Sequence, residues 1–258
     1  MKPRCFIVLT ALCQLAFALS PQPAKAQADF CGLNDTECLH ETILHTATSL
    51  TDKTERDKTL RELAKSWAAA GNMKKALEIV PMIETPDTRA MTIRGIGMEL
   101  STLNISKDER GKIFSSLREE AEKMKAAHAP SYAIALTYIA MSQAFAGDNE
   151  EARKTAGEME NEALRHKAFG ETAEIQAERG DYINAKISLD KIDDIPYKNK
   201  AYATVSRLLA SQNQLEDAYD AAMQITNPYL KATALQNILN VQGMLKNAPV
   251  QTQTAPQE

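Results

Sequence analysis

Residues 169–185 read FGETAEIQAERGDYINA, and this stretch decides the fold. Phe169 and Ala173 are four residues apart, which places them on one face of a helix. Gly180 can end that helix, because glycine adopts the left-handed backbone conformation that other residues disfavour. Ala185, five residues later, lets a returning helix pack closely against the first. The stretch therefore predicts a helix-turn-helix hairpin.

The same pattern occurs in three other segments. With the turn residue as position 0, the turn and position +5 are occupied by Gly71 and Ala76, Gly147 and Ala152, Gly180 and Ala185, Asn213 and Ala218. Large residues stand at position −11: Leu60, Leu136, Phe169 and Tyr202. Small residues stand at position −7: Ala64, Ala140, Ala173 and Ser206. Apolar residues stand at position +12: Ile83, Met159, Ile192 and Ile225. Each hairpin has an apolar face that must be covered by its neighbours.

An irregular hairpin and two half-units complete the array. Asn104 lies 33 residues after Gly71, so residues 88–103 are predicted to form another first helix. The next helix begins at a capping box, Ser106 to Glu109, and is predicted to run to about His128, which lengthens the interval to the next turn to 43 residues. Residues 39–50 have the residue spacing of a second helix without its first helix. Residues 228–246 have the spacing of a first helix without its second helix.

These observations predict an all-α chain with four segments. Residues 1–26 are predicted to be a secretory signal peptide, and residues 27–50 an N-terminal segment with two cysteines and a capping helix. Residues 51–246 are predicted to be a domain of about five helix-turn-helix repeats, with capping helices at both ends of the array. Residues 247–258 are rich in Pro, Gln and Thr and are expected to be a disordered tail.

Over residues 39–246 the chain resembles the tetratricopeptide repeat family. The resemblance rests on large, small, glycine and alanine residues in the order of Phe169, Ala173, Gly180 and Ala185, with a proline such as Pro196 near the end of the unit. It implies a right-handed α-α superhelix, or solenoid. The sequence departs from the family in its 33-residue interval, where the family repeat has 34 residues, and in the apolar residues at position +12.

The N-terminus predicts export to the periplasm or secretion. Lys2 and Arg4 precede an apolar run of about 16 residues, shorter than the roughly 20 of a membrane-spanning helix. Small residues allow cleavage after Ala26 or after Ala28, with the first preferred. Removal of residues 1–26 takes away three basic residues and no acid, which changes the net charge from −4 to −7. This acidity argues against nucleic-acid binding, and no membrane span is expected after cleavage.

Two cysteines follow the predicted signal peptide. Cys31 and Cys38 form an isolated pair in a chain expected to reach an oxidising compartment. We predict a disulfide between them, with two unpaired thiols as the alternative. A loop this short would stabilise the chain by roughly 2 to 3 kcal/mol.

The sequence contains no recognisable catalytic, metal or cofactor site. In the stretch HETILH, His40 and His45 are five residues apart, whereas a zinc-protease helix needs two histidines four apart on one face. We expect both to be surface histidines. Trp67 and the methionines, including Met91, are expected to fill the core. No phosphate loop, nucleophile elbow or dinucleotide fingerprint is present.

The candidate binding residues are basic side chains on the first helices, which line the concave groove in proteins of the tetratricopeptide family. They occupy positions −13, −10 and −6 and are Lys58, Arg61, Lys65, Arg94, Lys167, Lys200 and Arg207. Such a groove could bind an acidic peptide or a carboxylate through charge-assisted hydrogen bonds. The alternative is that these are ordinary solvated residues in weak surface pairs with neighbouring glutamates.

We therefore expect an extracytoplasmic scaffold or adaptor that binds a protein or peptide, and not an enzyme. Two alternatives stay open. The protein could be a homo-oligomeric structural component of the cell envelope, with residues 106–128 as the self-association element. It could also be an enzyme whose catalytic residues are scattered over the groove.

Overall fold

The computed structural model describes residues 31, 32 and 34–247. The predicted signal peptide and both cleavage sites lie outside the described residues, as does the tail from residue 248 onward. The described part of the chain is all-α, with twelve α-helices, one short 3-10 helix and no strand. The prediction of an all-α fold is thus confirmed for this part.

The helices form two sets that alternate along the chain. The first set, here called first helices, comprises α2 (Lys53–Ala69), α4 (Pro86–Thr102), α6 (Ala129–Phe145), α8 (Glu162–Glu178), α10 (Ile195–Ser211) and α12 (Pro228–Asn247). The others, here called second helices, are α1 (Thr36–Ser49), α3 (Met73–Ile79), α5 (Lys107–Lys125), α7 (Asn149–Gly157), α9 (Tyr182–Leu189) and α11 (Leu215–Met223). The 3-10 helix Val80–Met82 continues α3.

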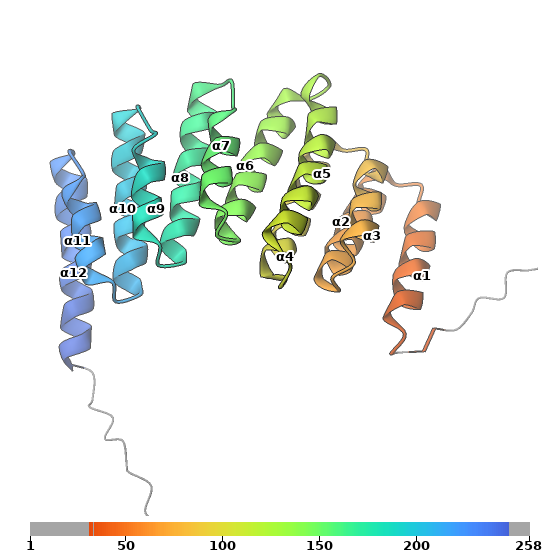
Figure 1. The fold of residues 1–258 in the computed structure, drawn as a ribbon, viewed down its shortest axis with the longest axis horizontal. Helices are drawn as coiled ribbons and strands as arrows, with labels where there is room; N and C mark the ends of the chain where they lie inside the picture. The colour runs from red at the N-terminus through yellow and green to blue at the C-terminus, as the bar shows by residue number, and fades with distance from the viewer. Residues whose placement is uncertain (1–30, 33, 248–258) are drawn as a thin grey trace, which may run out of the picture.

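The helices lie in a row in chain order, with α1 and α12 at opposite ends (Figure 1). Each first helix packs against the first helix before and after it. Each second helix from α3 to α11 packs against the first helices that precede and follow it, and α1 packs against α2. Contacts between neighbours in sequence therefore hold the row together.

The predicted turns form as the sequence indicates. Gly71, Gly147 and Gly180 have φ of 80°, 86° and 72°, and Asn213 has φ of 64°. Only glycine adopts this conformation without steric cost, and asparagine tolerates it better than most residues. The turn near Asn104 is different, because Asn213 is the only non-glycine residue with positive φ in the described part of the chain.

Small residues at the helix crossings allow the close packing. Ala64, Ala140 and Ala173, all at position −7, are fully buried. At the same position in α4, a Cβ on Gly97 would lie 2.6 Å from Oγ and 2.9 Å from Cβ of Ser142 on α6. The α4 and α6 backbones therefore approach more closely than an alanine would permit.

Several helix ends differ from the prediction; α1 begins at Thr36 and not at Leu39, and α4 begins at Pro86 and not at Thr88. α5 ends at Lys125 and not near His128, because the His128 ring caps the next helix by accepting a 3.3 Å hydrogen bond from the Ser131 N–H. At the C-terminal end, α12 extends to Asn247. Differences of one to three residues at helix ends are ordinary.

Candidate interaction surfaces

The predicted basic residues all lie on first helices. Lys58, Arg61 and Lys65 are on α2, Arg94 is on α4, Lys167 is on α8, and Lys200 and Arg207 are on α10. α6, in the middle of the row, carries none of them. The structure thus places the basic residues in two groups, separated by α6.

Several of these cations have acidic or aromatic partners. Arg61 pairs with Glu62 at 2.6 Å, Lys167 pairs with Glu171 at 3.6 Å, and Lys65 lies 4.0 Å from Glu99. The Arg94 guanidinium lies 5.4 Å from the ring centre of Tyr138. Exposed ion pairs contribute about 0–1 kcal/mol and exchange easily with a ligand. Among the described residues, Lys58, Lys200 and Arg207 have no salt bridge.

The α8 part of this surface is acidic. Glu174 lies at position −6 and is partly buried. Burial raises the pKa of its carboxyl above the ordinary value, and the charges of Glu171 and Glu178 raise it further, while Arg207 acts in the opposite direction. Negative charge is therefore crowded beside the basic residues of α10.

Between the two basic groups lies a set of apolar side chains, here called the central apolar patch. It consists of Met91, Met98, Ile134, Tyr138 and Met141 on α4 and α6. Met91 is 36% exposed and Ile134 is 37% exposed. The expectation that the methionines fill the core is wrong for Met91, as it is for Met82 and Met223, which are also exposed. Met91 and Ile134 both stand at position −13, and Met98, Tyr138 and Met141 are partly buried.

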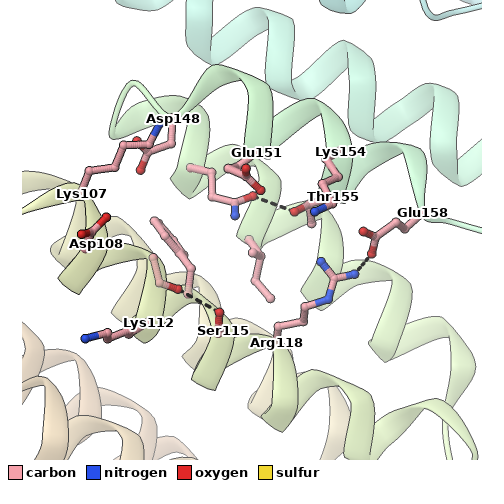
Figure 2. A pocket seen from close by; sticks show the side chains of 14 residues that line it. Lys107, Asp108, Lys112, Ser115, Arg118, Asp148, Glu151, Lys154, Thr155 and Glu158 are labelled. Carbon is pink, nitrogen blue, oxygen red and sulfur yellow. Dashed lines mark hydrogen bonds and ion pairs between the residues drawn. The ribbon is translucent and has the colours of Figure 1, made fainter.

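A cleft lies between the second helices α5 and α7 (Figure 2). Its volume is about 790 Å³, and Ile139 and Gln143 of α6 lie at its base. Figure 2 shows Ser115 and Arg118 along α5, with Thr155 across the cleft on α7. α5 builds one wall with residues between Lys107 and Arg118, in its N-terminal part.

Charged groups surround this cleft. Arg110 holds Asp148 at its edge through hydrogen bonds of 2.8 and 3.1 Å, and Arg118 pairs with Glu158. These side-chain hydrogen bonds raise the pKa of Arg110 above its ordinary value. Lys112 and Lys154 also line the cleft and make no salt bridge within the described residues. The sequence indicated a long helix here, but not that it borders a cleft.

The N-terminal helix α1 is fixed by an aromatic contact. The rings of His40 and Trp67 stack with their centres 4.0 Å apart, and a 2.7 Å hydrogen bond joins His40 Nε2 to Ser66 Oγ. The prediction of a core position for Trp67 is confirmed. The prediction of a surface position for His40 is wrong, because α1 packs against α2 through this residue; His45 is exposed as predicted. The sulfur atoms of Cys31 and Cys38 lie 2.00 Å apart, at disulfide-bond distance.

The described residues contain neither a metal-binding cluster nor a membrane-spanning helix. No group of three or more His, Cys, Asp or Glu residues there is arranged to hold a metal ion. None of the helices described is both long enough and apolar enough to cross a membrane.

No known protein family and no curated protein matches this chain. Among solved structures, the chain is similar to Ton1535 from Thermococcus onnurineus NA1, with 13% sequence identity and a TM-score of 0.24. The likeness covers 81% of this chain and 86% of that one. A TM-score this low carries no argument about fold or function.

Proposed function

We propose that this protein is an extracytoplasmic scaffold or adaptor that binds a protein or peptide along the exposed side of its first helices. In this proposal the helical row is a right-handed, tetratricopeptide-like solenoid of five hairpins with a half-unit at each end. The central apolar patch is the observation that carries the proposal. Met91 and Ile134 are exposed on the packed neighbours α4 and α6, and exposed apolar side chains that gather on one surface are typical of interaction sites.

The charges around the patch suggest the chemistry of the partner. Lys58 and Lys65 lie on α2 to one side, and Lys200 and Arg207 lie on α10 to the other. A partner segment with apolar residues at its centre and acidic residues at its ends would complement this order. Methionine side chains adapt to different apolar surfaces, which suits a binding patch.

Two features of the N-terminal region support a location outside the cytoplasm. The first 26 residues have the pattern of a cleavable signal peptide. Cys31 and Cys38 lie at disulfide-bond distance, and disulfides persist mainly in oxidising compartments.

Photo-crosslinking in the native cell tests the proposal. A photoreactive amino acid at Ile134, in the patch, should form crosslinks to another protein. The matched control is Ile183 on α9, which is 75% exposed and lies on a second helix. Mass spectrometry should identify a partner that crosslinks from Ile134 and not from Ile183. Equal crosslinking from both positions, or none from Ile134, would contradict the proposal.

Charge reversal tests whether the basic residues contribute to binding of the partner. Lys167→Glu and Lys200→Glu together should weaken binding of the crosslinked partner by about tenfold, because charge-assisted contacts would be lost. Lys191→Glu, at an exposed site after α9, is the control. Unchanged affinity in the double variant would show that the basic residues are ordinary solvated side chains.

A further inference from the structure

The two ends of the helical row each have an uncovered groove. At the C-terminal end, a groove of about 570 Å³ between α11 and α12 is lined by Leu215, Tyr219, Leu239 and Gln242, among others. At the N-terminal end, a groove of about 430 Å³ lies between α1 and α2 and is lined by Ile43 and Leu63 together with Lys58, Thr59, Glu62 and Ser66. We call these the C-terminal groove and the N-terminal groove. Terminal units of solenoids usually present a polar outer face, so the exposed apolar side chains Leu239 and Ile43 in these grooves need an explanation.

The C-terminal groove has the position of a missing second helix. α10 begins at Ile195, which is 18 residues before its turn residue Asn213. Counting the same 18 residues from Pro228, where α12 begins, places position 0 at residue 246 and Leu239 at position −7. That position is fully buried against the second helix in α2, α6 and α8, whereas Leu239 is 58% exposed. The face of α12 that would contact a second helix is therefore uncovered.

The α11 side of the groove leads to the same conclusion. Leu215 and Tyr219 stand at positions +2 and +6 of their second helix. In α7 the residues at these positions contact the next second helix: Asn149 donates a 2.9 Å hydrogen bond to Asp181, and Arg153 donates one of 2.9 Å to Asn184. α11 thus presents to the groove the positions that elsewhere touch a neighbouring second helix.

The N-terminal groove has the position of a missing first helix. Cys38 lies 33 residues before Gly71, which gives Ile43 position +5 in α1. Position +5 is alanine in α3, α7, α9 and α11, and each of these alanines is fully buried against its own first helix. Ile43 is 41% exposed because no first helix precedes α1 in the described residues.

We propose that a second copy of this chain fills both grooves in a single head-to-tail contact. α12 of one copy would act as the first helix, and α1 of the next copy as the second helix, of a complete hairpin. α12 then occupies the N-terminal groove of the next copy, while α1 of that copy occupies the C-terminal groove of the first. This inference does not depend on the partner of the central apolar patch.

A buried hydrogen bond supports the choice of a second copy as the occupant. In the hairpin of α6 and α7, the third along the chain, Gln143 at position −4 accepts a 2.8 Å hydrogen bond from the hydroxyl of Thr155 at position +8. In the hairpin of α8 and α9, the fourth along the chain, Gln176 at position −4 accepts a 2.7 Å hydrogen bond from the hydroxyl of Ser188 at position +8. Glutamine at position −4 is thus matched by a hydroxyl at position +8.

The other regular hairpins have apolar residues at both positions. These pairs are Trp67 with Ile79 and Leu209 with Ala221. The two half-units divide the glutamine and hydroxyl pair between them, with the glutamine on α12 and the hydroxyl residue on α1. Position −4 of α12 is Gln242, and position +8 of α1 is Thr46; both side chains are exposed. Docking α1 of one copy on α12 of another would bring Gln242 opposite Thr46. The Thr46 hydroxyl, which donates a 2.8 Å hydrogen bond to the carbonyl oxygen of Thr42 in the single chain, would turn to Gln242 and reproduce the bond of α6 with α7 and of α8 with α9.

The contact joins two different surfaces, so it can repeat. A heterologous contact of this kind produces an open filament, or a ring if the rotation between copies closes. Each added copy would continue the helical row, and its first-helix surface, into the next.

The molar mass of the protein purified from cells, measured in solution, tests the proposal. Light scattering over a range of concentrations should show species that grow with concentration or a defined ring. Leu239→Glu and Ile43→Glu should each reduce the protein to the monomer, because each places a charge in one of the grooves. Ile183→Glu, at an exposed site away from both ends, should assemble like the unchanged protein. Circular dichroism shows whether each variant is folded. If Leu239→Glu or Ile43→Glu does not fold, Leu239→Gln or Ile43→Gln is used in its place.

Mixing the two end variants distinguishes head-to-tail association from a symmetric dimer. Ile43→Glu retains an intact C-terminal groove, and Leu239→Glu retains an intact N-terminal groove. The mixture should therefore form a dimer with one copy of each variant and nothing larger. A monomeric unchanged protein at its highest soluble concentration would overturn the proposal, as would a mixture that stays monomeric.

A disulfide provides an independent measurement. Positions −7 and +5 lie close together within hairpins, where Ser206 Oγ donates a 2.8 Å hydrogen bond to the carbonyl oxygen of Ala218. Leu239→Cys mixed with Ile43→Cys should therefore form a covalent dimer on oxidation, in contrast to either variant alone. Equal dimerisation of a single variant alone would indicate a symmetric contact and overturn the head-to-tail arrangement.

Discussion

The carboxylate of Asp57, at the N-terminal part of α2, accepts a 2.7 Å hydrogen bond from the backbone N–H of Thr85, 28 residues later. Asn199 on α10 accepts a bond of the same length from the N–H of Thr226. Both acceptors stand at position −14 of a first helix, and both donors lie in the segment that leads to the next first helix. The contact therefore sets how one hairpin follows another.

Asp57→Asn should make the protein less stable at neutral pH and less sensitive to acid. Burial alone would raise the pKa of Asp57, but hydrogen bonds from Thr85 and Glu84 and the charge of Arg56 outweigh it, so the pKa lies below its ordinary value of 3.8. The stabilisation is complete above that value and is lost as the pH falls through the lower pKa of the folded state. The loss at pH 7 should be about 1 kcal/mol, since bonds to charged groups are stronger.

Urea unfolding at pH 7 and at pH 3 measures this difference. The fall in the free energy of unfolding between the two pH values should be smaller for Asp57→Asn than for the unchanged protein. An equal fall in both would show that Asp57 does not contribute to the acid sensitivity.

Gly97→Ala and Gly95→Ala should change stability in opposite directions, although both lie in α4. An alanine is favoured over glycine within a helix by about 1 kcal/mol. At Gly95 the added Cβ would meet only Lys65, at 3.7 Å, which is ordinary contact. At Gly97 it would clash with Ser142, and overpacking costs about 1–3 kcal/mol.

Thermal unfolding of the two variants is the measurement. Gly95→Ala should raise the melting temperature and Gly97→Ala should lower it. A Gly97→Ala variant at least as stable as Gly95→Ala would contradict the close approach of α4 and α6.

Thr155→Val should destabilise the protein by about 1–3 kcal/mol, because the buried oxygen of Gln143 would lose its donor. Gln143→Leu in the same chain should recover part of this loss, since Leu209 and Ala221 already form an apolar pair at the corresponding positions. A double-mutant cycle in urea gives the coupling between the two changes. Purely additive losses would mean that the two side chains act independently.

Glu174→Gln should stabilise the protein slightly at pH 7. Burial and then the neighbouring acids raise the pKa of Glu174, so the ionised side chain is disfavoured in the folded state. The gain should stay below about 1 kcal/mol, because solvent screens a partly exposed charge. It should disappear as the pH falls below the ordinary glutamate value of 4.5, where both states are protonated.

Denaturation curves at pH 7 and pH 4 test this effect, with Glu119→Gln on α5 as an exposed control. A gain that persists at the lower pH would indicate that loss of charge is not its cause.

Most of the secondary structure followed from local patterns. The positive φ of Gly71, Gly147, Gly180 and Asn213 agrees with the predicted turns, because a left-handed turn depends on the residue type at that position. The tetratricopeptide resemblance, the export and the partner stay predictions. The cleft beside α5 was not predicted, because its walls come from helices of two different hairpins.

The sequence by itself determined which segments are helical and where they turn, since spacing, small residues and turn residues act within one hairpin. Only the tertiary structure decided which surfaces stay uncovered. His40 became buried by stacking on Trp67 of the next helix, while Met91 and Ile134 stayed exposed. The exposure of Leu239 and Ile43 also depends on the absence of a neighbouring helix in the described chain. Exposure of this kind depends on how helices distant in sequence cover one another, which no local pattern specifies.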